Sequence, residues 1–196
     1  MDTIGAIVSR RSNRSFAKDT VEEEKLKKII EAGRYAPSGG NNQSNHFLVV
    51  QNKTVLEKLA VLAKDAFSKM EITENTYSSL KLSISLSKKG DYVFHYNAPV
   101  LVIIANQKDY GNNMADSAVA AENMMIAANE LDLASCWINQ IHWLTEDENM
   151  LAYLKELGLK NSERVYASVA IGYPNTPDKI PARVPLPRKG NEVTYI

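Results

Sequence analysis

The segment ADSAVAAENMMIAANEL, residues 115–131, is the most informative part of this 196-residue chain. Its apolar residues occupy nearly every side of the helix that the segment predicts, at Ala118–Ala121, Met124–Ala128 and Leu131. A helix that is apolar all round is buried all round. We therefore expect a central helix, covered either by its own domain or by a second subunit.

Helices and strands alternate around this central helix. Thr20 and Glu23 have the spacing of a capping box, so a helix is expected to begin at Thr20 and to end before Pro37. Further helices are predicted at 2–10, after Asn52 and at 147–157, and strands at 47–50, 99–105, 134–138 and 165–171. The Ser-rich residues 65–95 indicate either a helical or a mobile insert. The order predicts an α+β fold with helices flanking a mixed sheet.

The chain is expected to form one domain, residues 1–173, followed by an extended arm. Five of the seven prolines lie in residues 174–196, at positions 174, 177, 181, 185 and 187. Proline has no backbone N–H and a fixed φ, so this segment is predicted to have little regular structure of its own. At 23 residues it is too short to be a second domain.

Composition excludes several classes of protein. Lys plus Arg and Asp plus Glu both number 23, so the formal net charge is zero, which argues against a general nucleic-acid-binding role. No apolar run approaches the ~20 residues that span a bilayer, and no secretory signal pattern is visible. Cys136 is the single cysteine. We therefore expect a cytoplasmic protein with no nucleic-acid and no membrane partner.

The common catalytic motifs are absent from the sequence. There is no G-x-G-x-x-G after a strand, no P-loop, no G-x-S-x-G and no H-E-x-x-H. The three histidines are too scattered to predict a metal site, and Cys136 sits in an apolar stretch that favours a buried, inert thiol. No catalytic side chain and no metal are expected.

Two clusters of cations could bind an anion. Arg10, Arg11 and Arg14 lie within five residues, and guanidinium groups match phosphate oxygens bidentately. The alternative is a solvated helix end whose cations offset the helix dipole. Arg183 and Arg188–Lys189 lie in the arm, which is either a solvated tail or a stiff segment that reaches back to an anion.

A third segment of interest is the loop APSGGNNQ, residues 36–43. Its glycines allow a ligand to approach backbone N–H groups closely, and its amides can meet the edge of a planar heterocycle. All these residues also form turns, so a plain connection between a helix and a strand is the alternative.

In this order the three segments resemble those of the nitroreductase family of flavoenzymes along nearly the whole chain. The resemblance is carried by Arg10-Arg11-Ser12-x-Arg14-x-Phe16, Ala36-Pro37-Ser38-x-x-Asn41-x-Gln43, Asp116-x-x-x-Ala120-x-x-Asn123, Leu133-x-Ser135-Cys136-Trp137-Ile138 and Ile171-Gly172-Tyr173-Pro174 before the arm. It implies a homodimer with two FMN molecules at the subunit interface, and a C-terminal arm that wraps around the partner.

The resemblance also implies which residues bind FMN. Arg10, Arg11, Ser12 and Arg14 would hold the phosphate, the ribityl chain and the pyrimidine edge, and Arg188 and Lys189 would close over the phosphate. Pro37, Ser38, Gly39 and Asn41, in the loop that contains Gln43, would come from the partner, and Ile138, Asn139 and Gln140 would lie along the ring near N5.

The family chemistry implies reduction of nitroaromatics, quinones or similar flat acceptors by NAD(P)H through a ping-pong cycle at the flavin N5. Two positions depart from the family pattern. Ser44-Asn45 replaces Pro-Trp, and Asn139-Gln140 replaces an acidic residue followed by glycine. The alternatives are a specialised flavin reaction on the same fold, such as dehalogenation, and a flavin-binding module without turnover.

Overall fold

The computed structural model describes residues 2–196, which form seven α-helices, one 3-10 helix and four strands. The helices are α1 (Thr3–Ser9), α2 (Glu23–Arg34), α3 (Lys53–Ser68), α4 (Ser78–Lys89), α5 (Asn113–Glu130), α6 (Gln140–Trp143) and α7 (Glu148–Glu156), with the 3-10 helix at Gly39–Asn41. The strands are β1 (His46–Val50), β2 (Val100–Gln107), β3 (Ala134–Ile138) and β4 (Glu163–Gly172). The α+β class is confirmed.

The four strands form one sheet in the order β1-β2-β4-β3, and each neighbouring pair is antiparallel. The prediction of a mixed sheet is therefore wrong for these strands. The connection from β2 through α5 to β3 returns in the same direction, as a parallel crossover does. However, β4 lies between β2 and β3 and pairs with both in the opposite sense.

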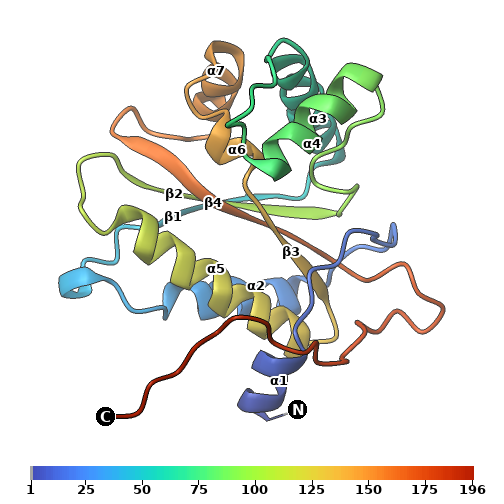
Figure 1. Ribbon diagram of the computed structural model, residues 1–196, viewed down its shortest axis with the longest axis vertical. Coiled ribbons are helices and arrows are strands. Elements are labelled where there is room, and N and C mark those ends of the chain that lie inside the picture. The colour runs from blue at the N-terminus through green and yellow to red at the C-terminus, as the bar shows by residue number, and fades with distance from the viewer. Residues whose placement is uncertain (1) are drawn as a thin grey trace.

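Helices cover both faces of the sheet (Figure 1). The helices α3, α4, α6 and α7 lie on one face, and α2 and α5 lie on the other. The strand β2 contributes to both cores, because successive side chains point to opposite faces. Leu101 and Ile103 pack into the first core, whereas Val102 and Ile104 pack into the second.

The helix α5 is the central helix that the sequence predicts, but one chain does not bury it on every side. Ala120, Met124 and Ala128 are fully buried between α2 and the sheet. Met114 and Val119 are 43% and 38% exposed. An apolar strip of α5 therefore faces away from the chain's own core.

Local details agree with the sequence in some places and differ in others. Asn52 caps α3 as expected, since its side chain accepts the Val55 N–H at 3.2 Å. The prediction of a capping box at Thr20 and Glu23 is wrong, because α2 begins after Glu22 and has no side-chain cap hydrogen bond. Val21, which lies just before α2, is buried in the core. The apolar face of α1 is open, with Ile4 69% exposed.

The insert 65–95 is ordered into the end of α3, the helix α4 and a connection that buries Phe94 and His95. Thus the helical alternative holds. The four-residue helix α6 has no counterpart in the sequence prediction.

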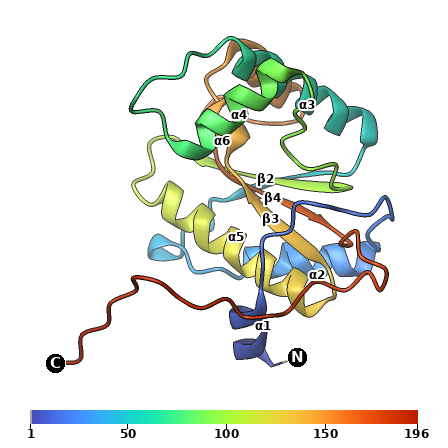
Figure 2. The ribbon, with the colours of Figure 1, turned by 45° about the vertical axis from the view of Figure 1, so that its right-hand side comes forward.

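Residues 174–196 contain no helix or strand and run as an extended arm past the C-terminal ends of α5 and α1 (Figures 1 and 2). Arg183 fastens the arm, because its Nη2 donates to the Asn129 carbonyl and lies 2.6 Å from Asp132 Oδ1. The C-terminal end of the arm projects away from the body in both views. Among residues 2–196, no helix is long and apolar enough to cross a membrane.

Candidate functional site

The arginine-rich segment 10–14 runs beside β3. Arg10 ends α1 in an extended conformation, at φ −56° and ψ 133°. Ser12 then forms an isolated parallel bridge with Ser135, and the Asn13 N–H donates to the Ser135 carbonyl at 2.9 Å. These backbone contacts fix the segment along the strand that ends at Ile138.

The guanidinium groups of this segment are only partly neutralised. Arg10 Nε lies 3.5 Å from Glu122 Oε1 on α5, and this buried nitrogen makes no hydrogen bond within the described chain. Arg11 Nη1 donates to the Val184 carbonyl of the arm at 3.0 Å. Arg14 is exposed and forms no ion pair with any residue from 2 to 196. The segment therefore carries three cations, of which only Arg10 lies close to a carboxylate, so it has a local excess of positive charge.

Cys136 lies beneath this segment and is 2% exposed. Burial raises the pKa of the Cys136 thiol, although Arg14, Ser12 and Arg10 act in the opposite direction. A protonated, inaccessible thiol is a poor nucleophile. The prediction that Cys136 is buried is confirmed, and an inert thiol stays a prediction.

The loop 36–43 is anchored to the first turn of α5. The Gly39 N–H lies 3.2 and 3.3 Å from the two carboxylate oxygens of Asp116. The Tyr110 hydroxyl lies 2.9 Å from Asp116 Oδ2 and 3.0 Å from the Gly39 carbonyl. A buried carboxylate and a tyrosine therefore hold the backbone of the loop from beneath.

The same loop holds itself in an unusual conformation. Gly40, Asn41 and Gln43 have φ values of 59°, 56° and 49°. The Ser38 hydroxyl accepts the Gln43 N–H at 2.9 Å, and the Gln43 amide donates to Asn41 Oδ1 at 3.0 Å. The three left-handed residues require glycine or residues that tolerate this region, such as asparagine.

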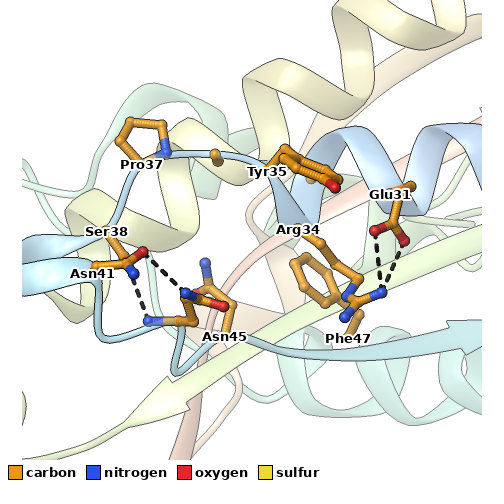
Figure 3. A pocket seen from close by; sticks show the side chains of 11 residues that line it. Glu31, Arg34, Tyr35, Pro37, Ser38, Asn41, Asn45 and Phe47 are labelled. Atoms are coloured by element: carbon orange, nitrogen blue, oxygen red, sulfur yellow. Dashed lines mark hydrogen bonds and ion pairs between the residues drawn. The ribbon is translucent and has the colours of Figure 1, made fainter.

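A cavity of about 490 Å³ lies between this loop, the end of α2 and the start of β1. Pro37, Ser38, Asn41 and Gln43 are among its lining residues. Figure 3 shows the loop side chains on one side, and the ion pair between Arg34 and Glu31, 2.8 Å long, on the other. Cavities of this size accommodate small molecules or part of a partner chain.

Three further residues that were predicted to contact the flavin lie at the end of β3 or directly after it. Ile138 is 1% exposed, whereas Asn139 is half-buried and occupies the N-cap position of α6 without a side-chain cap hydrogen bond. Asn139 Oδ1 accepts the Trp137 indole N–H at 2.5 Å. Gln140 is buried, and its amide nitrogen donates to the Tyr92 hydroxyl at 2.8 Å. Only Asn139 of these three residues has a side chain that is substantially accessible.

One chain brings some of the predicted residues together and leaves others apart. Ser135 and Ile138 are three residues apart on β3, so the arginine segment and the strand end lie about 10 Å from each other along the strand. The loop 36–43 lies elsewhere, at the start of α5, and the two segments are separated in both ribbon views. Arg188 and Lys189 are exposed in the arm, where Arg188 Nε donates to the Leu186 carbonyl at 3.3 Å.

Three supporting residues escaped the sequence reasoning. Tyr110 contacts the loop 36–43, and Glu122 lies close to Arg10. Neither residue belongs to a sequence pattern that predicts such a contact. Asn45, which directly precedes β1, is bonded to β2 and to α5. Its Oδ1 accepts from Asn106 and from Ser117 at 3.0 Å each, and its Nδ2 donates to the Asp116 carbonyl at 3.0 Å. The sequence offers one indication of this network, which is the polar residue Asn106 in the otherwise apolar strand β2.

Comparison with known proteins gives consistent results. The nitroreductase family model matches residues 7–173. A crystal structure of a nitroreductase with bound FMN from Bacteroides fragilis has 33% sequence identity and a TM-score of 0.87, and covers 100% of this chain and 99% of that one. A protein of Archaeoglobus fulgidus, provisionally named NADH dehydrogenase/NAD(P)H nitroreductase, is 27% identical over 86% of this chain and 83% of its own length. A BluB-like flavoprotein from Clostridium difficile is 25% identical, with a TM-score of 0.75 over 100% of this chain and 99% of that chain.

Proposed function

Because this chain belongs to the nitroreductase family, we propose that it is an FMN-dependent oxidoreductase that uses NAD(P)H to reduce nitroaromatics, quinones or similar flat acceptors. The observation that carries the proposal is the full-length match, at 33% identity, to a nitroreductase with bound FMN. Relatives with NAD(P)H nitroreductase and NADPH-dependent FMN reductase names support the choice of electron donor.

The donor groups of this chain fit the phosphate and the pyrimidine edge of FMN. The buried Arg10 Nε lacks a hydrogen bond and Arg14 lacks an ion pair, so both have donors to spare within the described chain. A phosphate dianion needs several such charge-assisted donors. We assign Arg10, Arg11, Ser12 and Arg14 to the phosphate, the ribityl chain and the pyrimidine edge. Arg188 and Lys189 of the arm would close over the phosphate.

The separation of the loop 36–43 from the arginine segment favours a site shared between two copies. In a homodimer, Pro37, Ser38, Gly39 and Asn41 of one subunit would contact the flavin ring held by the other, with Gln43 shaping the loop. The exposed strip of α5 at Met114 and Val119 gives such a dimer an apolar surface to bury. The arm, which leaves the body of its own chain, would wrap around the partner.

The end of β3 would lie along the flavin ring. When bound, FMN supplies hydride transfer at N5, from NAD(P)H in one half of a ping-pong cycle and to the acceptor in the other. The chain's own residues orient the ring and supply charge. Arg10 would place a positive charge at the pyrimidine edge. Asn139 and the buried Ile138 would define the surface near N5, and no side-chain acid or base is assigned.

A screen of acceptors tests the reaction. We expect the purified protein to oxidise NADH or NADPH steadily with nitroaromatic or quinone acceptors. A halogenated acceptor in the same screen tests the alternative, a specialised flavin reaction on this fold. If NAD(P)H is not consumed with any acceptor although FMN binds, the chain is a flavin-binding module without turnover and the proposed reaction is wrong.

A further inference from the structure

Gln140 directly follows Asn139, but its side chain is bonded to the helical layer above the sheet. Its Nε2 donates to the Tyr92 hydroxyl at 2.8 Å and to Ser83 Oγ of α4 at 3.3 Å. Ser83, Tyr92 and Gln140 are 1%, 7% and 8% exposed. The two amide protons of Gln140 are thus both engaged inside the protein.

The hydrogen positions in this cluster can be assigned from donor and acceptor chemistry. Ser83 Oγ lies 3.1 Å from the Ser79 carbonyl, which can only accept, and 2.8 Å from the Tyr92 hydroxyl. Ser83 has one proton, and donating it to Ser79 leaves Ser83 Oγ as the acceptor for Tyr92. The bonds then run in one direction, from Gln140 through Tyr92 and Ser83 to the backbone of α4, with every donor satisfied. Burial raises the pKa of Tyr92, so its hydroxyl keeps its proton.

An aromatic contact joins α6 to α4 at a second point. The Trp143 ring lies edge-on to Tyr77, the residue before α4, with ring centroids 6.2 Å apart. Within α6, the Trp143 N–H donates to the Asn139 carbonyl at 3.0 Å. The segment 139–143 therefore contacts α4 through both Gln140 and Trp143.

Asn139 lies between two fixed neighbours. Trp137 precedes it and donates its indole N–H to Asn139 Oδ1 at 2.5 Å. Gln140 follows it and is held by α4 and Tyr92. The two side-chain anchors lie on either side of one half-buried residue, so we expect a change in either anchor to displace that residue.

We propose that Gln140, Tyr92 and Ser83 form a positioning unit that holds Asn139 against the edge of the flavin, so that Gln140 acts through Asn139 instead of contacting the ring. The inference rests on the proposed function, because it requires FMN to lie at the end of β3. It assigns α4, which lies within the insert 65–95, to the support of the reactive edge. A small displacement at such an edge is sufficient to slow hydride transfer.

The variant Tyr92→Phe tests the positioning unit, since it removes the central hydroxyl and keeps the ring. Ser87→Ala is a matched control. Ser87 lies one turn further along α4, is 4% exposed, and its hydroxyl makes no hydrogen bond within the described chain. Both variants remove one buried hydroxyl from the same layer, but only one of the two hydroxyls belongs to the unit.

Two readouts separate positioning from general damage to the fold. In the flavin-loaded enzyme, we expect Tyr92→Phe to shift the midpoint potential of FMN and to lower kcat about tenfold with a change in KM below about threefold. In the FMN-free protein, hydrogen exchange should rise together in α4 and in residues 139–143. Ser87→Ala should match the wild type in both readouts.

If Tyr92→Phe fails to fold, Gln140→Met and Ser83→Ala test the same unit from either side and should show the same potential shift. The inference is overturned if the variants that fold match Ser87→Ala in potential, kcat and hydrogen exchange while the wild type binds FMN normally. A wild-type protein that binds no FMN overturns the proposed function as well, which distinguishes the two failures.

Discussion

The Asp116 carboxylate accepts the Gly39 backbone N–H across 77 positions of sequence, with its two oxygens 3.2 and 3.3 Å from that nitrogen. This contact joins the first turn of the central helix to the loop that the sequence singles out for ligand binding. A side chain on Gly39 could not be accommodated without movement, because a Cβ there would lie 2.1 Å from Asn112 Nδ2. The loop conformation therefore depends on the helix below it.

We predict that Asp116→Ala loosens this loop. The Gly39 N–H and the Tyr110 hydroxyl would both lose a charged acceptor, which costs about 1.5–3 kcal/mol in the free energy of unfolding. Hydrogen exchange of residues 38–43 should increase. Asp109→Ala, which removes an exposed carboxylate nearby, is the control and should leave this exchange unchanged. Equal exchange in the two variants would show that Asp116 does not hold the loop.

Arg14→Ala should weaken FMN binding with little effect on folding. Arg14 is exposed and forms no ion pair within residues 2–196, so its removal breaks no internal salt bridge. A charged hydrogen bond to phosphate is worth about 1.5–3 kcal/mol, or about a 10- to 100-fold increase in Kd. Fluorescence titration of the flavin-free protein measures this directly.

Lys155→Ala removes one exposed positive charge from α7 and serves as the control for Arg14→Ala. It should bind FMN as the wild type does. If Arg14→Ala also retains wild-type affinity, the assignment of the phosphate to this segment is wrong.

Glu163 should make the stability of the protein dependent on pH in the acid range. It is 1% exposed, with Oε2 at 2.8 Å from His46 Nδ1 and 3.0 Å from the Lys160 N–H. Burial opposes ionisation, but the contacts with His46 and Lys160 outweigh it and hold the pKa of Glu163 below its ordinary value of 4.5. A carboxyl with a lowered folded-state pKa stabilises the protein above its unfolded-state pKa, and this contribution is lost as pH falls through the folded-state value.

Glu163→Gln removes this contribution. At pH 7 we expect the variant to be less stable than the wild type by about 2 kcal/mol, the scale of a hydrogen bond to a buried charge. The difference should shrink as pH falls from the ordinary carboxyl pKa of 4.5 through the lower folded-state pKa, because the wild-type carboxyl is then becoming neutral too. Urea unfolding at a series of pH values measures the difference. A gap that stays constant down to the acid limit would show that the charge on Glu163 contributes nothing.

Gly172→Ala should destabilise the end of the sheet. A Cβ at this position would lie 2.5 Å from Pro99 Cδ and 2.9 Å from Pro99 Cγ, and the proline ring cannot rotate away. Overpacking of this kind costs about 1–3 kcal/mol. At Gly111 an added Cβ meets nothing within 4 Å, so Gly111→Ala should leave the thermal midpoint close to the wild type. Similar midpoints for both variants would rule out the steric role of Gly172.

The sequence was most informative where structure is determined locally. The strand at 134–138 and the cap at Asn52 both follow from a few adjacent residues, and the structure has both. The antiparallel sheet could not be read in this way. Its pairing depends on β4 entering between β2 and β3, and β4 follows both strands in the chain. Whether two strands pair in parallel or antiparallel is determined by the tertiary arrangement and not by local periodicity.

The candidate site also contains residues that local sequence indicates and residues that only the tertiary structure identifies. The segment 10–14 is visible in the sequence as a cluster of arginines, and the loop 36–43 as a cluster of glycines and amides. Their supports are single residues distant in sequence, such as Asp116 beneath Gly39 and Tyr92 beside Gln140. An isolated polar residue on a predicted helix or in an insert gives no indication of its partner. Only the three-dimensional structure pairs them.

The central claim is that each chain holds one FMN that NAD(P)H reduces. An anaerobic titration of the purified protein measures both parts, by the amount of FMN bound per chain and by the loss of its visible absorbance on addition of NADH or NADPH. We predict a yellow protein with one FMN per chain, bleached by at least one of the two nicotinamides. A colourless protein that takes up no FMN on reconstitution would contradict the claim.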